Sequence, residues 1–243
     1  MSIDIRNLSV DIGTKKILSN ISISFGSGLH IVFGRNGAGK TTLFRAIAGL
    51  IKFSGDILVN GVSIRSLGRR ELSKVIGYVW QNPYYGFIET SVKAEIEAIL
   101  NILGVEGDWS IAEILVPRYL WDRDPSTLSG GEARRVSIAS VLIADQPIWL
   151  LDEPFTNLDS DGVEALLRVI DMGRRKGKTI VIALHETFYA YLLKPDTVTI
   201  LDGGRVVYRD VWSSIEDSIL RRYGLIPIGD ICAGYSHRRD THV

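Results

Sequence analysis

Cysteine is nearly absent from this chain of 243 residues, which contains only Cys232. A single cysteine excludes an internal disulfide and is typical of a protein that works in a reducing compartment. The first residues also lack the charged start and apolar stretch of a signal peptide. Together these absences predict a cytoplasmic protein.

Long apolar runs are missing too. The longest candidate, residues 136–151, is interrupted by Asp145, Gln146 and Pro147, and is therefore a poor membrane span. We expect no direct membrane insertion, so that any membrane role depends on a partner. Because 28 basic residues balance 28 acidic ones, the composition also gives no sign of a nucleic-acid partner. The apolar content of 46% is ample for a sizeable core.

A glycine-rich loop carries the clearest signal. Residues 34–42 fit the phosphate-binding pattern G-x-x-x-x-G-K-[ST]. An apolar stretch at 29–33 predicts a buried strand before the loop, and the spacing over 43–50 predicts a helix after it. The expected phosphate-binding residues are Gly34, Arg35, Asn36, Gly37, Ala38, Gly39, Lys40, Thr41 and Thr42. A glycine-rich turn that merely contains a lysine is the alternative, which the strand and helix context disfavours.

The residue types in this loop suit phosphate chemistry. Glycines let the backbone approach phosphate oxygens, and successive N–H groups at a helix N-terminus form a nest for an anion. Lys40 would reach the β- and γ-phosphates, and the Thr41 hydroxyl would hold Mg²⁺. The loop therefore predicts a nucleotide site, although it does not by itself define a function.

Two acids end a later apolar strand, residues 148–152. Open parallel sheets bind ligands at the carboxyl ends of their strands. Asp152 there would anchor Mg²⁺, and Glu153 would act as a general base toward water. A strand that simply ends in polar residues remains the alternative.

The stretch from Leu128 to Glu132 opens a strong helix, expected over 131–143. Ser129 followed by two glycines leaves free N–H groups at a positive helix end, which is a second anion site. The alternative is an ordinary capping box between Ser129 and Glu132. Capping rules alone favour the box.

These motifs, in this order, resemble those of ATP-binding cassette (ABC) ATPases over residues 3–209. Residues 34–42 resemble the Walker A loop of that family, and 128–132 resemble its signature sequence. Gln81 resembles the Q-loop glutamine, 148–153 the Walker B strand with its acid, 157–159 the D-loop, and His185 the switch histidine.

The resemblance implies a head-to-tail dimer that holds two molecules of ATP with Mg²⁺. Each ATP would lie on the Walker A loop of one subunit and face Ser129, Gly130 and Gly131 of the other. Glu153, His185, Lys40 and Gln81 would be catalytic, with Thr41, Gln81 and Asp152 around the metal. Asp159 would link the two sites across the interface.

One position departs from the family pattern. An aromatic residue that stacks on adenine usually stands where this chain has Ile12. Stacking on an aromatic ring contributes about 1–3 kcal/mol per base, so Ile12 predicts lower ATP affinity or weaker base selectivity. A milder departure is Glu186, where Asp is commoner.

The predicted fold is α/β: a P-loop NTPase core with a mixed sheet, an antiparallel β edge and an inserted, mainly helical subdomain. We expect the core over 1–81 and 148–218, the helical subdomain with the signature motif over 82–147, and a C-terminal tail over 219–243. Strands at 3–11 and 17–25 would form the antiparallel edge beside the nucleotide strand. Other expected elements are strands at 56–59, 75–80, 179–184 and 197–201, and helices at 91–103, 111–119 and 162–175.

The leading functional hypothesis is the ATP-hydrolysing subunit of an ABC transporter, held on the inner face of the cell membrane by a separate permease. The aromatic segment 82–88 is either the docking surface for a permease helix or part of the core. Its surroundings resemble importer ATPases, especially the energy-coupling-factor group. The alternatives are a soluble ABC-type ATPase in cofactor assembly or other non-transport machinery, and a plain phosphate-loop kinase or GTPase.

Overall fold

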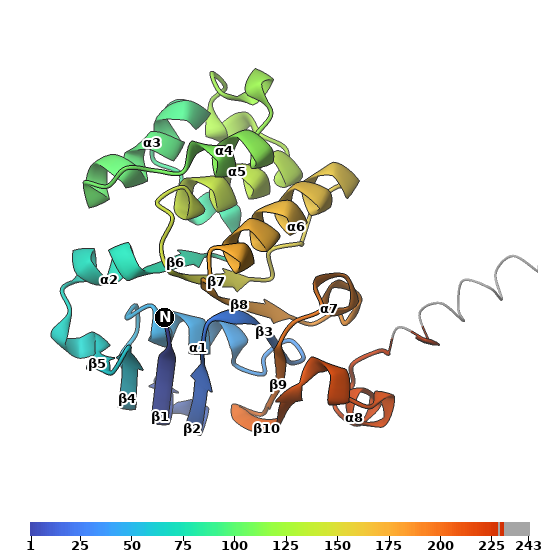
Figure 1. Ribbon diagram of the computed structural model, residues 1–243. Coiled ribbons are helices and arrows are strands. Elements are labelled where there is room, and N and C mark those ends of the chain that lie inside the picture. Colours follow the sequence, from blue (N-terminus) through green and yellow to red (C-terminus); the bar gives the residue numbers. More distant parts are fainter. Residues whose placement is uncertain (228, 231–243) are drawn as a thin grey trace, which may run out of the picture.

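The computed structural model describes residues 1–227 and 229–230. Cys232 and the part of the expected tail from residue 231 onward lie outside the described residues. Two sheets and the helices around them make up the described chain (Figure 1).

The larger sheet has six strands in the order β10-β9-β3-β8-β7-β6. Its neighbouring strands pair in parallel, except that β10 runs antiparallel to β9. This arrangement confirms the predicted α/β class with a mixed sheet. The strands are β3 (Gly28–Phe33), β6 (Ile76–Val79), β7 (Ile148–Asp152), β8 (Thr179–Leu184), β9 (Thr197–Asp202) and β10 (Arg205–Val211).

The antiparallel strands form a second sheet, in the order β2-β1-β4-β5. They are β1 (Ile3–Ile12), β2 (Lys15–Phe25), β4 (Ser54–Val59) and β5 (Val62–Ser63). The expected position beside the nucleotide strand is wrong, because β8 and β9 occupy both edges of β3. Strands β1 and β2 instead pack their alternating apolar face toward α1.

The eight α-helices of the described chain lie mainly around the larger sheet. They are α1 (Lys40–Ile47), α2 (Arg69–Val75), α3 (Val92–Leu103), α4 (Trp109–Leu115), α5 (Gly130–Leu142), α6 (Ser160–Arg175), α7 (Phe188–Leu193) and α8 (Asp217–Arg222). Single 3₁₀ turns are η1 (Ile64–Ser66), η2 (Pro83–Tyr85), η3 (Arg118–Leu120), η4 (Pro125–Thr127) and η5 (Trp212–Ser214). Helices α3, α4 and α5 gather beyond α6, on the side of the large sheet away from β1 and β2 (Figure 1).

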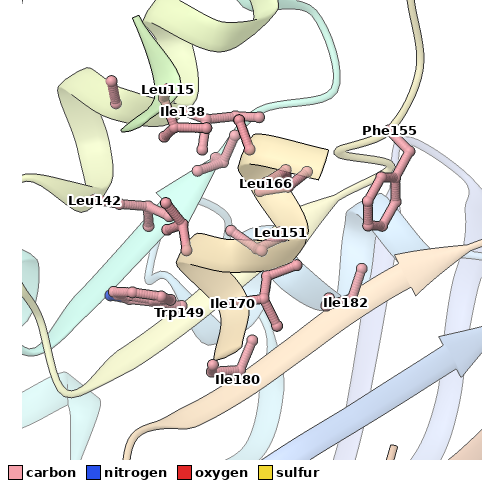
Figure 2. Packing of buried hydrophobic residues seen from close by; sticks show 14 of the residues in the cluster. Leu115, Ile138, Leu142, Trp149, Leu151, Phe155, Leu166, Ile170, Ile180 and Ile182 are labelled. Atoms are coloured by element: carbon pink, nitrogen blue, oxygen red, sulfur yellow. The ribbon is translucent and has the colours of Figure 1, made fainter. Parts of the chain in front are cut away.

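Alternation along the strands builds two cores, one on each face of the large sheet. On β7, Trp149 and Leu151 face α6 and the α3–α5 group, while Ile148 and Leu150 face α1 and the smaller sheet. Figure 2 shows the first of these cores, with Leu166 of α6 above the strands. The sheet is therefore buried on both faces, and its strand ends are left as the place for a site.

Helix lengths explain the remaining differences from expectation. Helices α2, α7 and α8 went unpredicted because six or seven residues are too few to display helical periodicity. Helix α4 ends at Leu115, before Pro117, and a 3₁₀ turn replaces the rest of the expected 111–119 helix. Within the described ranges, no helix has the length and apolar character needed to cross a membrane.

Candidate functional site

Four adjacent strands of the large sheet end at the same edge, and each is followed by a predicted site residue. The phosphate loop follows β3, His185 follows β8, Glu153 follows β7, and Gln81 comes shortly after β6. Because β3, β8, β7 and β6 are neighbours in this order, residues up to 151 positions apart in sequence meet at one edge.

The phosphate loop runs from Gly34 to the first turn of α1. Gly39 has φ +105°, which favours glycine, and a Cβ at Gly34 would lie only 2.6 Å from the Leu201 carbonyl oxygen. Lys40 is buried, and its ammonium donates to the Gly34 carbonyl at 2.7 Å. These constraints fix the loop around a cavity of about 390 Å³.

The remaining loop residues line or border this cavity. Arg35, Asn36 and Gly37 are exposed, whereas Ala38 is buried and donates its N–H to the Arg35 carbonyl at 3.0 Å. The cavity is lined by Lys15, Ile17, Asn36, Gly37, Ala38, Gly39, Lys40, Thr41, Thr42, Gln81 and Glu153. The structure thus brings most of the predicted phosphate-binding residues together with Gln81 and Glu153.

Glu153 lies between two basic side chains. One carboxylate oxygen is 3.2 Å from Lys40 Nζ, and the other is 3.0 Å from His185 Nδ1. The backbone of Glu153 is in the left-handed region, with φ +47°, which is uncommon for a residue other than glycine. On its other side, His185 Nε2 is 3.6 Å from the Glu186 carboxylate.

Asp152 is fully buried at the end of β7. The Tyr78 hydroxyl donates to its Oδ2 at 3.4 Å, while Oδ1 has no hydrogen-bond partner. Burial raises the pKa of Asp152, and the neighbouring Thr41 hydroxyl and Lys40 ammonium oppose that rise. A buried carboxylate oxygen without a partner, next to a threonine hydroxyl, is a donor set that suits Mg²⁺.

Arg134, on α5, holds the backbone behind this edge. It is 1% exposed, and it donates to the carbonyl oxygens of residues 80 and 81 and of residues 152–154. Burial lowers the pKa of Arg134 to about 10, and the carboxylates of Asp152 and Glu153 oppose this. The helical pattern of the sequence did not distinguish this buried arginine from an ordinary surface one.

Ser129, Gly130 and Gly131 lie at the N-terminus of α5 and do not line the phosphate-loop cavity. Ser129 forms the predicted capping box with Glu132: the Ser129 hydroxyl accepts from Glu132 N–H at 3.4 Å, and Glu132 accepts from Ser129 N–H at 2.8 Å. The Ser129 bonds lower the pKa of Glu132. The capping box satisfies only the third N–H group of the helix, so the N–H groups of Gly130 and Gly131 remain available to an anion.

Asp159 caps another helix, α6, by accepting from Gly162 N–H at 2.8 Å. Its carboxylate also lies 4.0 Å from Arg135 of α5. The preceding Asn157 contacts the helix N-terminus of α5, since a Cβ on Gly131 would lie 2.8 Å from the Asn157 carbonyl oxygen. The glycines at 130 and 131 therefore allow this close approach as well as a free helix end.

Ile12 is 56% exposed at the end of β1, where it pairs with Lys15 of β2. The cavity at the phosphate loop reaches Lys15 and Ile17 rather than Ile12 itself. Sequence reasoning missed these two residues. Their position in the sequence could have indicated them, because Lys15 and Ile17 come just after the turn at Gly13, on the strand that pairs with the strand of Ile12.

The aromatic segment 82–88 is partly packed in the core and partly exposed, so each of the two alternatives, core packing and a docking surface, fits some of its residues. Phe87 packs against the helical core, and the Tyr84 hydroxyl donates to the Leu128 carbonyl at 3.3 Å. Tyr85 and Ile88, in contrast, are 72% and 70% exposed. The segment is anchored by two of its aromatics and presents two apolar side chains outward.

Comparison with known proteins gives consistent matches. The model of the family described as ABC transporter matches residues 18–156. A protein of Pyrococcus furiosus named as an ABC transporter ATP-binding protein is 38% identical, over 87% of this chain and 84% of its own length. An energy-coupling factor transporter ATP-binding protein of Thermotoga maritima is 30% identical, over 87% of this chain and 83% of its own.

A solved structure supports the fold. A dimeric bacterial ABC transporter cassette superposes with a TM-score of 0.75 at 24% identity, covering 86% of this chain and 98% of that one. The same architecture therefore occurs in a protein whose sequence has largely diverged.

Proposed function

Because the chain belongs to the ABC transporter family and is an ATP-binding, ATP-hydrolysing subunit of that family, we propose that it drives a separate membrane permease by ATP-dependent dimerisation. The partner is a second ATPase subunit, identical or homologous, arranged head to tail. The ATPase would reach the inner face of the membrane only through the permease.

The proposal that the chain hydrolyses ATP in this way rests on the position of Glu153 between Lys40 and His185. A carboxylate held at the mouth of a phosphate loop can take the proton of an attacking water as a general base. Lys40 and His185 are the two groups beside it that can bind phosphoryl oxygens and stabilise the charge that develops on them.

The loop residues would bind the triphosphate through backbone N–H groups and the Lys40 ammonium. Asp152 Oδ1 and the Thr41 hydroxyl would hold Mg²⁺, and Gln81, in the segment that follows β6, would complete the set. When bound, the ion neutralises charge on the β- and γ-phosphates. The buried, unpartnered Oδ1 supports this assignment.

The signature residues support the dimer. Ser129, Gly130 and Gly131 form a helix N-terminus with available N–H groups, yet they do not line the cavity of their own phosphate loop. An anion site of this kind is completed when the ATP of a partner subunit faces it, with Asp159 beside the contact. The γ-phosphate would then hold the dimer together, and its loss would loosen it.

We also propose the division of the chain on which this mechanism depends: a core over 1–81 and 148–218, a helical subdomain over 82–147 and a tail over 219–243. A small groove of about 190 Å³ lies where helices α3 and α5 meet α2, β6 and the segment that follows α1. Trp80 lines this groove, and the exposed Tyr85 and Ile88 follow it in the chain. A permease helix bound there would sense movement of the helices against the core.

Glu153→Gln tests the ATPase mechanism. The variant keeps the size of the side chain but removes the base, so ATP should remain bound and dimers should accumulate on size-exclusion chromatography. Dimers should appear with ATP and not with ADP. A Glu153→Gln protein that hydrolyses ATP at the wild-type rate, or stays monomeric with saturating ATP, contradicts the proposal.

Membrane attachment separates a transporter subunit from a soluble ATPase of the same family. In its native cells the wild-type chain should sediment with membranes. The Tyr85→Glu variant should remain in the supernatant and retain its ATPase activity. Tyr119→Glu is the matched control, because Tyr119 is 71% exposed against 72% for Tyr85 and lies in the same helical region. A wild-type chain that stays wholly in the supernatant would favour the non-transport alternative.

A further inference from the structure

Arg134 is a charged side chain buried within the second turn of α5, with 1% of its surface exposed. All of its hydrogen bonds go to backbone carbonyl oxygens. Nη2 donates to Asp152 and Glu153, both at 2.8 Å, Nε donates to Pro154 at 3.1 Å, and Nη1 donates to Gln81 at 3.3 Å and to Trp80.

The geometry uses every donor that an arginine has. A guanidinium carries five N–H groups in a fixed plane, and five carbonyl groups accept them here. Burying a charge is strongly unfavourable unless its hydrogen-bonding groups are satisfied. Lysine has three donors on a flexible stem, so it cannot reproduce this set.

The five carbonyls belong to two segments of the catalytic edge. Trp80 and Gln81 form the exit from β6, and residues 152–154 form the exit from β7. Arg134 itself is on the helix that begins beside Ser129. One side chain therefore joins the helical region to both strand exits.

Glu153 needs such support. Its φ of +47° is a left-handed conformation that is unfavourable for a residue with a Cβ. Glu153 N–H donates to the Ala183 carbonyl at 3.1 Å, and Arg134 holds the carbonyl on the other side of the same residue. These two bonds fix the backbone, and the carboxylate then reaches Lys40 and His185.

We propose that Arg134 is a positioning residue for ATP hydrolysis, which holds the backbone of Glu153 in its left-handed conformation and keeps it in register with Gln81. Arg134 touches neither the phosphate-loop cavity nor Lys40 and acts only through these carbonyl groups. The proposal rests on the proposed role of Glu153 as the base. A misplacement of about 1 Å at such a group costs about 100-fold in rate.

The neighbouring Arg135 does not share this role. It donates to the Leu115 carbonyl at 2.5 Å and lies 4.0 Å from Asp159, so its contacts stay within the helical region and the cap of α6. A useful matched control is Arg174 of α6, which donates to the Leu193 and Lys194 carbonyls far from the catalytic edge.

The first experiment compares Arg134→Lys and Arg134→Gln with Arg174→Lys. For the Arg134 variants we expect the Kd for ATP and the KM to stay within about twofold, while kcat falls about 10- to 100-fold. Arg174→Lys should retain wild-type kcat. If Arg134→Gln fails to fold, the test rests on Arg134→Lys alone. A wild-type kcat in Arg134→Lys overturns the proposal.

The second experiment asks whether Arg134 acts through Glu153. In the Glu153→Gln background there is no base to position, so adding Arg134→Lys should leave the residual rate unchanged and ATP-dependent dimers intact. A further drop equal to that seen in the wild-type background, or loss of the dimer, would show that Arg134 merely supports the fold of α5. If Glu153→Gln alone hydrolyses ATP normally, the proposed function fails instead, whatever Arg134 does.

Discussion

The Lys40 ammonium lies 3.2 Å from the Glu153 carboxylate, and both groups are almost completely buried. In this arrangement the proposed base is paired with the cation that the γ-phosphate of ATP is expected to bind. A triphosphate entering the loop would compete with Glu153 for Lys40. ATP binding would thereby release the carboxylate to act on water at the moment when the substrate arrives.

Lys40→Ala should abolish hydrolysis, because it removes the cation that binds the terminal phosphates. We expect kcat to fall by about 100-fold or more, as for other losses of an electrostatic contact to the reacting group. The measurement is phosphate release at saturating ATP. Lys178→Ala is the control, since Lys178 is also buried but bonds to the Asp145 and Gln146 carbonyls away from the site. Full activity in Lys40→Ala would refute the assignment of the site.

Ser129→Arg should block ATP-dependent dimers without changing ATP binding by the monomer. A bulky cation would fill the helix end that is proposed to face the partner's γ-phosphate. The dimer is best measured by size-exclusion chromatography in a Glu153→Gln background, and monomer binding with a fluorescent ATP analogue.

Loss of the cap itself must be separated from loss of the interface in this test. Replacing an N-cap serine costs about 1 kcal/mol of stability. Ser91→Arg makes the same kind of change at α3, where Ser91 accepts from Ala94 N–H at 3.2 Å, and should leave dimerisation intact. If Ser129→Arg also loses monomer ATP binding, Ser129 serves the fold and not the interface.

The sequence predicted the strand ends well because each motif stands directly after a buried apolar strand. Loop 34–42, Asp152 and His185 all follow such runs, so their convergence follows from a parallel sheet. The contacts of Arg134 could not be predicted, because its partners are backbone carbonyls and leave no trace in residue identity. The separate antiparallel sheet was also missed, since alternation shows which face of β1 is buried but not which strands pair with β3.

Ile12→Tyr should strengthen ATP binding. An aromatic ring at this position could stack on adenine, which is worth about 1–3 kcal/mol, or about 5- to 150-fold in Kd. Because Ile12 is 56% exposed, we expect the gain in ATP affinity to be near the lower end of this range. Val62→Tyr, at another exposed position of the same sheet, is the control.

Inorganic tripolyphosphate distinguishes base stacking from other effects of this substitution. Its affinity should not change in Ile12→Tyr, since it has no base. Equal gains for ATP and tripolyphosphate would contradict the position of Ile12 at the adenine end. An unchanged ATP affinity would place the base against Lys15 and Ile17 instead.

His30 should make the stability of the fold sensitive to mild acid. It is 5% exposed on β3, with Nδ1 2.8 Å from the Thr197 hydroxyl and Nε2 2.9 Å from the Gly26 carbonyl. Burial lowers the pKa of His30 below its usual 6.5; nearby Arg209 lowers it further, while the Gly26 carbonyl and Asp196 oppose this. The unfolded chain therefore binds the proton more readily than the folded one, so the His30 contribution is complete above pH 6.5 and declines as the pH falls below it.

The free energy of unfolding, measured by urea titration between pH 7.5 and 5.5, should reveal this decline. The slope due to one histidine is at most about 1.4 kcal/mol per pH unit. His30→Gln keeps a hydrogen-bonding side chain but cannot titrate, so its slope below pH 6.5 should be smaller than that of the wild type. An identical slope in wild type and His30→Gln would mean that the folded protein takes up this proton without cost, which the burial of His30 in β3 argues against.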